Sequence, residues 1–344
     1  MKKYTKIILI ASLTGLVVMG VFAYRVYDTF FGPNTRFTTK SYELYIPTGS
    51  SYEEAFKIVA AAVDDRDALH QTATKKGYHK NVKPGRYILK QGMSNNDIVD
   101  NIRSSNVPIR VQFNNQERLE NLAGRIGSQL EADSLSLLTA MRDSVFLEDH
   151  GFNQNNALSM YLPNQFEFYW NTSAAQFRKR MLEYHDKFWN EKRLAQANRL
   201  ELNPSQVYVL ASIVQKETAA VDERPRVAGV YLNRMRKGIK LDADPTVIYS
   251  KKLADNDFDQ IIKRVLYKDL EIDSPYNTYQ NAGLPPGPIV TPDLNAIDAV
   301  LNPENHDYYY FVADVENFGY HKFAKTLAQH NRNAVAYRNW VARQ

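Results

Sequence analysis

An uncharged apolar segment near the N-terminus is the first clear pattern in the chain. It runs from Ile7 to Tyr24, with three lysines before it and Arg25 after it. Its length reaches the lower end of what a membrane-spanning helix needs, and the basic N-terminal flank predicts that the rest of the chain lies outside the cytoplasm. Val21 to Ala23 could instead be a signal-peptide cleavage site. We favour an uncleaved anchor because the run is longer than a usual leader, and both alternatives export the remainder.

Strand and helix periodicities alternate between residues 40 and 106. Tyr42 to Ile46 alternates like a strand, and Tyr87 to Leu89 is a second strand after a Pro-Gly turn. Helical spacing begins at Tyr52, at Arg66 and after the cap residue Ser94. The order strand, helices, strand, helix predicts a small α+β module. Its phrases IPTGSSYEEAFKI and KPGRYILKQGMSNNDIVDNI resemble a LysM-like module, a type that binds N-acetylglucosamine-containing glycans. A spacer without sugar affinity is the alternative.

The next region, 114–200, is mostly helical in pattern. A strand from Val107 to Phe113 leads into it, and helical spacing follows over Glu117 to Leu130 and over Asp133 to Asp149. The aromatic stretch Pro163 to Trp170 precedes a long charged helical region from Ala174 to Leu200. Most of these aromatic side chains are expected in a core.

A stronger helical pattern begins at Asn203, a plausible N-cap followed by Pro204 at the first helical position. Its apolar positions fall on one predicted face, namely Val207, Leu210, Ala211 and Val214. Continuing this face leads to Glu217 and Thr218. The helix is therefore expected to direct a carboxyl group along its apolar side at its C-terminal end.

That position has a chemical consequence for Glu217. An unpaired carboxylate on an apolar face is costly to ionise, and a negative charge at a helix C-terminus opposes the helix dipole. Both effects raise a pKa, and a carboxyl group that stays protonated near neutral pH suits a general acid. The alternative is an ordinary surface glutamate that pairs with Arg224, Arg226 or Arg234.

The C-terminal part contains four further patterns. Asp222 and Pro225 predict the start of a second helix that ends before Gly238, followed by a loop and short apolar run over Leu241 to Tyr249. Four prolines and two glycines between Ser274 and Ile289 predict a stiff loop, whose amides and hydroxyls suit sugar binding. Strands at 308–313 and 320–324 predict a hairpin, and a last helix starts at Thr326.

The composition of the chain excludes several classes of function. The formal net charge is +5, and the 43 Lys+Arg and 38 Asp+Glu residues are dispersed, so no nucleic-acid-binding stripe is expected. There is no cysteine, which excludes disulfides, thiolate catalysis and cysteine-based zinc sites. The sequence contains no HExxH, P-loop or GxSxG motif, and Asp222, Asp242 and Asp244 do not have EF-hand spacing. We therefore expect neither a metal nor a cofactor.

Three blocks in the C-terminal half resemble one known family. They read LASIVQKETAAVDERPRVAGVYLNRMRKGIKLDADPTVIY, SPYNTYQNAGLPPGPIVTP and YYYFVADVENFGYHKFAKTLAQHN, in the order found in the MltG (YceG-like) endolytic murein transglycosylases. Members of that family cleave peptidoglycan strands internally and leave 1,6-anhydro-N-acetylmuramic ends. The N-terminal anchor and LysM-like module also match the family's layout.

The resemblance assigns roles to particular residues. It implies that Glu217 is the catalytic acid, in the segment Ile213 to Thr218 that the family writes IVEKET. It also implies a glycan-binding set made of Asn233, Asp244, Tyr276, Asn277, Thr278, Tyr279, Gly283, Leu284, Pro285, Pro286, His321, His330 and Asn331. Because the sugar's own C6 hydroxyl would be the nucleophile, no second carboxylate is required, although Asp244 and Glu223 are the nearest acidic candidates.

The sequence departs from the family pattern at three places. Gln215 replaces the first glutamate of the IVEKET phrase, and the segments Phe113 to Gln116 and Pro163 to Gln165 lack the family's usual acidic phrases. These departures weaken the expectation of glycan contacts in the middle region. They also keep open a catalytically inactive wall-binding scaffold, next to a lysozyme-like muramidase that hydrolyses the same bond.

Together these patterns predict an α+β protein with a cytoplasmic tip and transmembrane helix at 1–34 and a LysM-like module at 40–106. A mixed α/β catalytic domain would occupy 107–344, with its helical region at 114–200 and its motif-bearing core at 201–344. We expect a single-pass protein of the cytoplasmic (inner) membrane with its catalytic domain outside the cytoplasm. Its expected partners are peptidoglycan strands, the inner membrane and peptidoglycan synthases.

Overall fold

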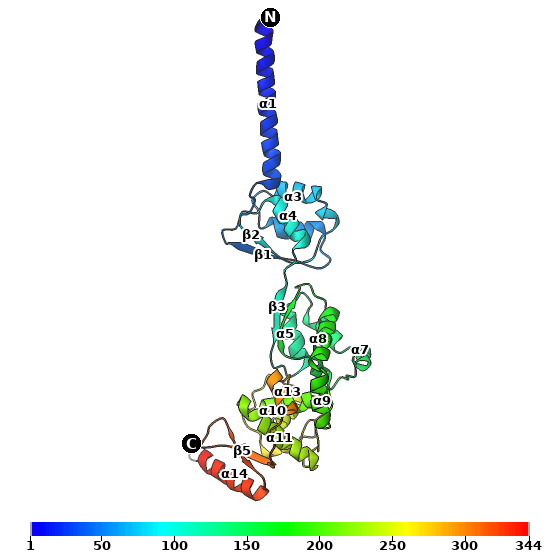
Figure 1. The fold of residues 1–344 in the computed structure, drawn as a ribbon, viewed down its shortest axis with the longest axis vertical. Coiled ribbons are helices and arrows are strands. Elements are labelled where there is room, and N and C mark those ends of the chain that lie inside the picture. The colour runs from blue at the N-terminus through cyan, green and yellow to red at the C-terminus, as the bar shows by residue number, and fades with distance from the viewer. Residues whose placement is uncertain (1, 343–344) are drawn as a thin grey trace. The chain divides into compact units, whose positions relative to one another are not determined.

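The computed structural model describes residues 2–342 and begins with helix α1, Lys2–Phe31 (Figure 1). The segment Tyr4–Phe31 has a mean hydropathy of 2.3 and is long and apolar enough to cross a membrane. The last turn of α1 is tied to the module that follows, because Asn95 Nδ2 donates to the carbonyl oxygen of Thr29 at 2.9 Å. The predicted N-terminal helix is therefore confirmed, and a leader peptide would have the same length and composition.

The chain divides into two compact units, of which the first comprises residues 1–111, 129–131 and 167–172. Its α+β part contains β1 (Ser41–Ile46), α2 (Tyr52–Ala60), α3 (Arg66–Lys75), η1 (Tyr78–Lys80), β2 (Gly85–Lys90) and α4 (Asn95–Ser104). The two strands pair antiparallel, with Leu44 opposite Tyr87, and both side chains are buried in the core of this unit. The predicted order of elements is confirmed, whereas the LysM-like assignment and the domain limits stay predictions.

The second unit comprises residues 112–128, 132–166 and 173–344 and is mostly helical. Strands β3 (Ile109–Phe113) and β4 (Asn164–Phe168) pair with each other, and both cross the limit between the units. The helices before the motif-bearing core are α5 (Leu119–Gly127), α6 (Ser134–Met141), α7 (Ser144–Asp149), η2 (Ala157–Met160), α8 (Ala174–Phe188) and α9 (Glu191–Arg199).

Two long helical regions of the sequence prediction are divided in the structure. The region 133–149 forms α6 and α7, and the region 174–200 forms α8 and α9. Each second helix starts at a new N-cap: Asp143 accepts from the backbone N–H of Phe146, and Asn190 accepts from that of Arg193. The helical pattern is confirmed, and each region is divided because short polar side chains offer the backbone a local partner and favour a restart.

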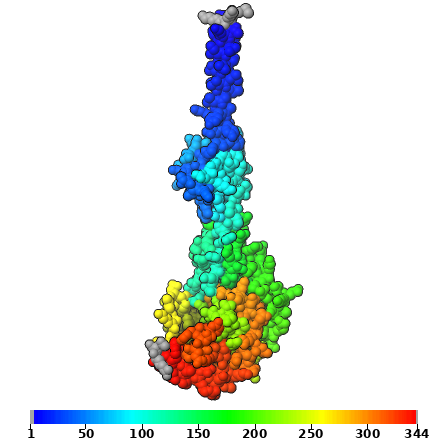
Figure 2. All heavy atoms as spheres, turned by 60° about the vertical axis from the view of Figure 1, so that its left-hand side comes forward, coloured from blue at the N-terminus to red at the C-terminus, as the bar shows by residue number. Residues whose placement is uncertain are grey.

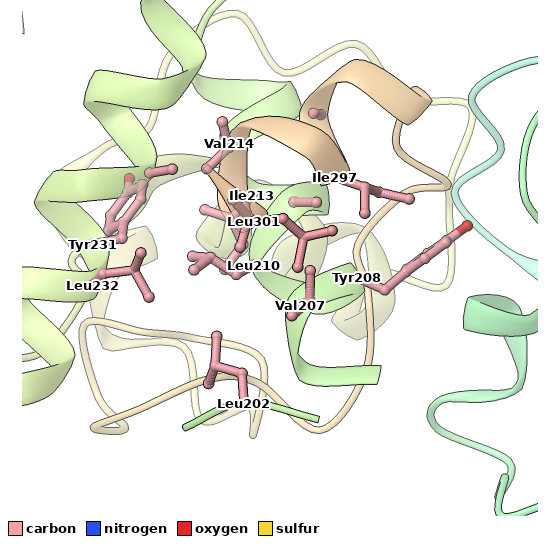
Figure 3. Packing of buried hydrophobic residues seen from close by; sticks show 14 of the residues in the cluster. Leu202, Val207, Tyr208, Leu210, Ile213, Val214, Tyr231, Leu232, Ile297 and Leu301 are labelled. Atoms are coloured by element: carbon pink, nitrogen blue, oxygen red, sulfur yellow. The ribbon is translucent and has the colours of Figure 1, made fainter. Parts of the chain in front are cut away.

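Helix α10 (Pro204–Glu217) lies at the centre of the second unit. All eight residues from Val207 to Val214 are buried, so the helix is covered on every side rather than on one predicted face. Figure 3 shows side chains of α11 (Arg224–Arg236) and α13 (Leu294–Leu301) around it, including Tyr231 and Leu301. Because α10 is held all round, its C-terminal residue has a fixed position.

Two C-terminal helices differ from the sequence prediction. The segment expected as a loop and short apolar run forms α12 (Asp244–Ala254), because Pro245 stands in its first turn, where no backbone N–H is needed. Helix α13 was not predicted. Between them the chain forms only the short helix η4 (Tyr267–Glu271), and the following proline-rich segment is a loop, as expected.

The predicted hairpin and terminal helix are confirmed. Strands β5 (Tyr310–Ala313) and β6 (His321–Ala324) pair antiparallel with Ala313 opposite His321, and α14 (Leu327–Val341) packs on both strands. In Figure 2 the orange and red C-terminal segment forms one contiguous part of the surface of the second unit. No side chain of α14 is fully buried, so the helix covers the hairpin and leaves one side to solvent.

Candidate active site

Glu217 is the last residue of α10, and the structure shows how the sequence fixes it there. Asn203 and Gln206 form a capping box at the start of the helix, with Pro204 at the first position. At the other end Thr218 leaves the helical conformation, with φ −137° and ψ 135°. The carboxyl group thus projects from the end of the central, fully packed helix into a cleft.

The cleft has a volume of about 500 Å³ and is lined by three groups of elements. The end of α10 contributes Glu217. The second side is formed by α11, the segment after it and the loop that carries Tyr279, and the third by the β5–β6 hairpin with α14. The lining residues are Glu217, Tyr231, Arg234, Leu241, Asp242, Asp244, Tyr279, Tyr310, Phe311, Val312, Ala313, His321, Leu327, His330 and Tyr337. Both aromatic and polar side chains line it, as suits a sugar ring.

Burial raises the pKa of Glu217 from 4.5 to about 7. The hydroxyl of Tyr231 donates to Glu217 Oε1 at 2.5 Å and opposes this rise, while the carboxylate of Asp244 adds to it. Burial and the neighbouring carboxylate also keep the pKa of Tyr231 above its ordinary value, so its hydroxyl remains the donor. Since Oε1 accepts from Tyr231, Oε2 is the oxygen that can carry a transferable proton.

The three arginines that could have paired with Glu217 have other acidic partners. Arg226 contacts Glu304 at 3.0 Å, Arg224 contacts Asp293 at 3.6 Å, and Arg234 binds Asp242. Lys216, the neighbour of Glu217 in sequence, contacts Glu117 at 3.0 Å and does not line the cleft. Among the described residues, no lysine or arginine is therefore paired with Glu217, and its hydrogen-bond partner is the neutral hydroxyl of Tyr231.

Two aspartates share the cleft with Glu217. Asp244 accepts a hydrogen bond from the hydroxyl of Tyr279 at 2.8 Å, while Asp242 is paired with the largely buried Arg234. Burial raises the pKa of Asp242, and Arg234 opposes that rise. Asp242 has φ 48°, a left-handed conformation that aspartate tolerates better than most residues. Each aspartate thus has its own partner in the cleft.

His321 and His330 enter the cleft from the C-terminal hairpin and helix. His321 Nδ1 contacts Glu223 Oε2 at 2.7 Å, and the ring packs on Phe311 at 5.0 Å between centroids. The ring of His330 stacks on Tyr310 at 5.4 Å with an interplanar angle of 28°. Burial and the nearby Arg234 lower the pKa of His330, so its ring is neutral at neutral pH.

Five of the predicted site residues therefore line one cleft: Glu217, Asp244, Tyr279, His321 and His330. Asn277 and Thr278 lie behind it and are fully buried. The amide of Asn277 donates to the carbonyl oxygens of Leu270 and Ile272, and the Thr278 hydroxyl accepts from the backbone N–H of Ala243. Their polar groups support the loop that carries Tyr279.

The other predicted glycan contacts also lie outside this cleft. The amide of Asn233 donates to the carbonyl oxygens of His306 and Tyr308, and Tyr276 packs on Tyr249 with centroids 4.8 Å apart. Asn331 is exposed on α14 but does not line the cleft.

The proline-rich loop packs against the protein rather than against the cleft. Its residues Gly283, Leu284, Pro285 and Pro286 do not line the cleft, and Leu284 packs on the main core. At Gly287 an added Cβ would lie 1.9 Å from the carbonyl oxygen of Asn155, so the two chain segments approach closely. This contact gives the loop a structural role in the second unit.

The segments that depart from the family pattern also have structural partners. Gln215 Nε2 donates to Asp293 Oδ2 at 3.0 Å, and Asn115 Nδ2 donates to the carbonyl oxygen of Thr291 at 2.8 Å. The backbone N–H of Gln116 donates to the hydroxyl of Thr291 at 2.8 Å. These amide side chains and backbone groups therefore connect the middle region and α10 to the loop before α13.

Sequence reasoning did not identify the direct partners of the two central side chains. The sequence singles out Glu223 only as a nearby acid and gives Tyr231 no role. Tyr231 lies fourteen positions after Glu217, and Glu223 lies 98 positions before His321. Helical spacing places Tyr231 on the buried side of α11, but no local signal shows which buried group its hydroxyl meets.

Fold and cleft together define a class of site: a single carboxylic acid with a raised pKa, bound by a neutral tyrosine in an aromatic cleft. The chain belongs to the YceG-like family, whose model matches residues 44–336.

Relatives and a solved structure agree with this placement. The chain is 28% identical to the endolytic murein transglycosylase of Bacillus subtilis (strain 168), over 94% of this chain and 91% of that protein. It is also 28% identical to the endolytic murein transglycosylase of Streptococcus pneumoniae serotype 2, over 86% of this chain and 58% of that protein. The crystal structure of a YceG-like protein from Listeria monocytogenes matches 85% of this chain and 98% of that chain, with 27% identity and a TM-score of 0.56.

Proposed function

We propose that the protein is an endolytic lytic transglycosylase that cleaves the bond between N-acetylmuramic acid and N-acetylglucosamine within peptidoglycan strands. The observation that supports this most directly is Glu217, a cleft carboxyl group with a pKa of about 7 and a neutral hydroxyl as its hydrogen-bond partner. A carboxyl group with a pKa near neutral pH can give a proton and take one back. The names of the relatives from B. subtilis and S. pneumoniae agree with this activity.

The reaction requires one proton donor and no added water. Glu217 gives the proton on Oε2 to the glycosidic oxygen, the bond from that oxygen to the muramic C1 breaks, and positive charge develops at C1. The C6 hydroxyl of the same sugar then attacks C1, and its proton passes to the Glu217 carboxylate. The products are a 1,6-anhydro-muramic end and a free hydroxyl on the leaving sugar, and Glu217 regains its starting state.

Tyr231 and the two aspartates fit this sequence of events. The Tyr231 hydroxyl stabilises the carboxylate that remains after the first proton transfer, because it already donates to Oε1. Asp244 and Asp242 keep their own partners, Tyr279 and Arg234. A hydrolytic mechanism would need a second carboxylate to activate water or to act as nucleophile, and Asp244 is the residue in the cleft that could serve.

Mass spectrometry of the products tests this function. Purified peptidoglycan strands are incubated with the full-length protein and with Glu217→Gln, and the new strand ends are identified. We expect new 1,6-anhydro ends with the wild type and none with the variant. New reducing ends would indicate a hydrolase, and a wild-type protein that makes no new ends would indicate a wall-binding scaffold.

We also propose that α1 anchors the protein in the cytoplasmic membrane by a single pass, with its N-terminus inside and the cleft outside. The length and hydropathy of Tyr4–Phe31 support the span, and the basic residues before it support the orientation. In this position the enzyme would meet nascent strands and their synthases. A chain recovered in the soluble fraction without its first residues would show that α1 is instead a cleaved leader.

A further inference from the structure

A buried glutamate behind the cleft contacts two nitrogen atoms of one histidine. Glu223 is 3% exposed and lies in the short helix η3 (Val221–Glu223). The backbone N–H of His321 donates to Glu223 Oε1 at 2.7 Å, and His321 Nδ1 lies 2.7 Å from Glu223 Oε2. Burial would raise the pKa of Glu223, but its interactions with His321, together with a hydrogen bond from Thr218, outweigh burial and leave that pKa lowered. Glu223 is therefore an ionised carboxylate.

The charge of Glu223 determines which nitrogen of His321 carries the proton. An ionised carboxylate only accepts hydrogen bonds, so Nδ1 must be the donor. In the neutral ring Nε2 is then the acceptor, and it is the ring nitrogen that remains for the cleft. Without such a partner the ring would be free to take the other tautomer.

The surroundings of His321 fix its ring as well as its tautomer. Its ring packs edge-on against Phe311, and Phe311 packs edge-on against Tyr231, which in turn binds Glu217. Its neighbour Tyr320 donates to the carboxylate of Asp222 at 3.1 Å, so two successive residues at the start of β6 bind two successive acids of η3. This double contact attaches the hairpin to the wall that carries Glu217.

We propose that Glu223 is a positioning residue that keeps His321 in the Nδ1–H form, so that Nε2 accepts a hydrogen bond from the attacking sugar hydroxyl beside Glu217. This inference rests on the proposed function and adds a substrate contact to it. His321 orients the hydroxyl, while the proton itself still passes to Glu217. His321 and Glu217 line the same cleft, and a hydroxyl aligned there is pre-positioned for attack on C1.

The kinetic test compares Glu223→Gln with Asp222→Asn in the full-length protein, using soluble labelled glycan strands as substrate. The glutamine amide can donate to Nδ1 and so favour the wrong tautomer. We expect kcat to fall roughly tenfold to a hundredfold in Glu223→Gln, with KM changed less than about threefold. Glu223→Asp should recover part of that loss because it restores a carboxylate. Asp222→Asn removes the adjacent charge but keeps an oxygen that can accept from Tyr320, and Asp222 does not bind His321, so kcat should stay within about threefold of the wild type.

The tautomer of the His321 ring can be measured by long-range nitrogen–hydrogen NMR of protein labelled with ¹⁵N-histidine. The variant His321→Ala is used to assign the signal. We expect the wild-type ring to be in the Nδ1–H form, and we expect that form to be lost in Glu223→Gln. A wild-type Nε2–H or doubly protonated ring would overturn the proposal, even if the variant failed to fold. It would also be overturned by wild-type kcat in Glu223→Gln, or by an equal loss in Asp222→Asn. Full activity of Glu217→Gln would instead contradict the proposed function.

Discussion

Two clefts of the second unit each contain a partly exposed glutamate, and the two carboxyl groups have opposite properties. Burial raises the pKa of Glu217 to about 7, and its polar partner is the neutral hydroxyl of Tyr231. Burial would also raise the pKa of Glu117, but contacts with Lys252 at 2.8 Å and Lys216 at 3.0 Å lower it instead. Glu217 is the more deeply buried and faces a neutral hydroxyl and the Asp244 carboxylate, whereas Glu117 faces two lysines.

At the end of helix α10, two residues adjacent in sequence line different clefts. Lys216 and Glu217 are adjacent at the end of α10, yet Lys216 lines the cleft of Glu117 and Glu217 lines the other. The lysine charge is thereby paired with Glu117 and does not serve to ionise Glu217. Glu117 is thus suited to stabilise the fold, and Glu217 is suited to exchange a proton.

Exchanging glutamate for glutamine at both positions should give the largest contrast. We expect Glu217→Gln to lower the rate of strand cleavage by a factor of roughly 10² to 10⁴, because the amide cannot give or take the proton. Glu117→Gln should leave the rate within about threefold of the wild type, since its carboxylate lies in the other cleft. Equal losses in the two variants, measured by release of new strand ends, would remove the distinction between the clefts.

Glu217→Gln should be more stable than the wild type at alkaline pH. The folded-state pKa of Glu217 lies above its unfolded value, so its contribution to stability is complete below about pH 4.5 and is lost as the pH rises through about 7. Glu217→Gln removes that loss, and we expect it to be more stable than the wild type at pH 8 by up to about 3 kcal/mol. Denaturant unfolding at pH 8 and pH 4.5 checks this, and the gain should vanish at the lower pH.

These contrasts also show what the sequence could establish. Glu217 was found from helical spacing and a family motif because both are local patterns. The burial of α10 on every side was not visible, since Ser212 and Tyr208 look polar in sequence but have hydrogen-bond partners inside the fold. The roles of Asn277 and Thr278 were equally hidden, because an amide or hydroxyl that suits a sugar equally suits a buried loop.

Removal of the Glu117 carboxylate should have the opposite pH dependence. Its pKa is lowered in the folded state, so the stability it contributes is present above its unfolded value and is lost as the pH falls through the folded value. We expect Glu117→Gln to lower the free energy of unfolding by about 1–2 kcal/mol at pH 7, since two lysines lose their partner. The difference in free energy of unfolding between Glu117→Gln and the wild type should narrow below pH 4 in the same unfolding assay. A difference independent of pH would contradict the ion-pair explanation.

Tyr231→Phe should produce a smaller change that isolates the hydrogen bond to Glu217. That bond lowers the pKa of Glu217, so its removal should raise the pKa and keep the acid protonated to higher pH. The alkaline limb of the pH–rate profile should therefore move upwards, with kcat reduced by less than about tenfold. A limb that moves to lower pH would mean that Tyr231 does not stabilise the carboxylate.

The most direct test of the account is a titration of the Glu217 side chain itself. Carbonyl ¹³C NMR of protein labelled with ¹³C-glutamate, compared with Glu217→Gln, identifies the one signal that the variant lacks. We predict that this signal titrates with a pKa of about 7 in the free enzyme. A signal that titrates near 4.5, the ordinary value for glutamate, would contradict the claim that the cleft keeps this acid poised to give and recover a proton.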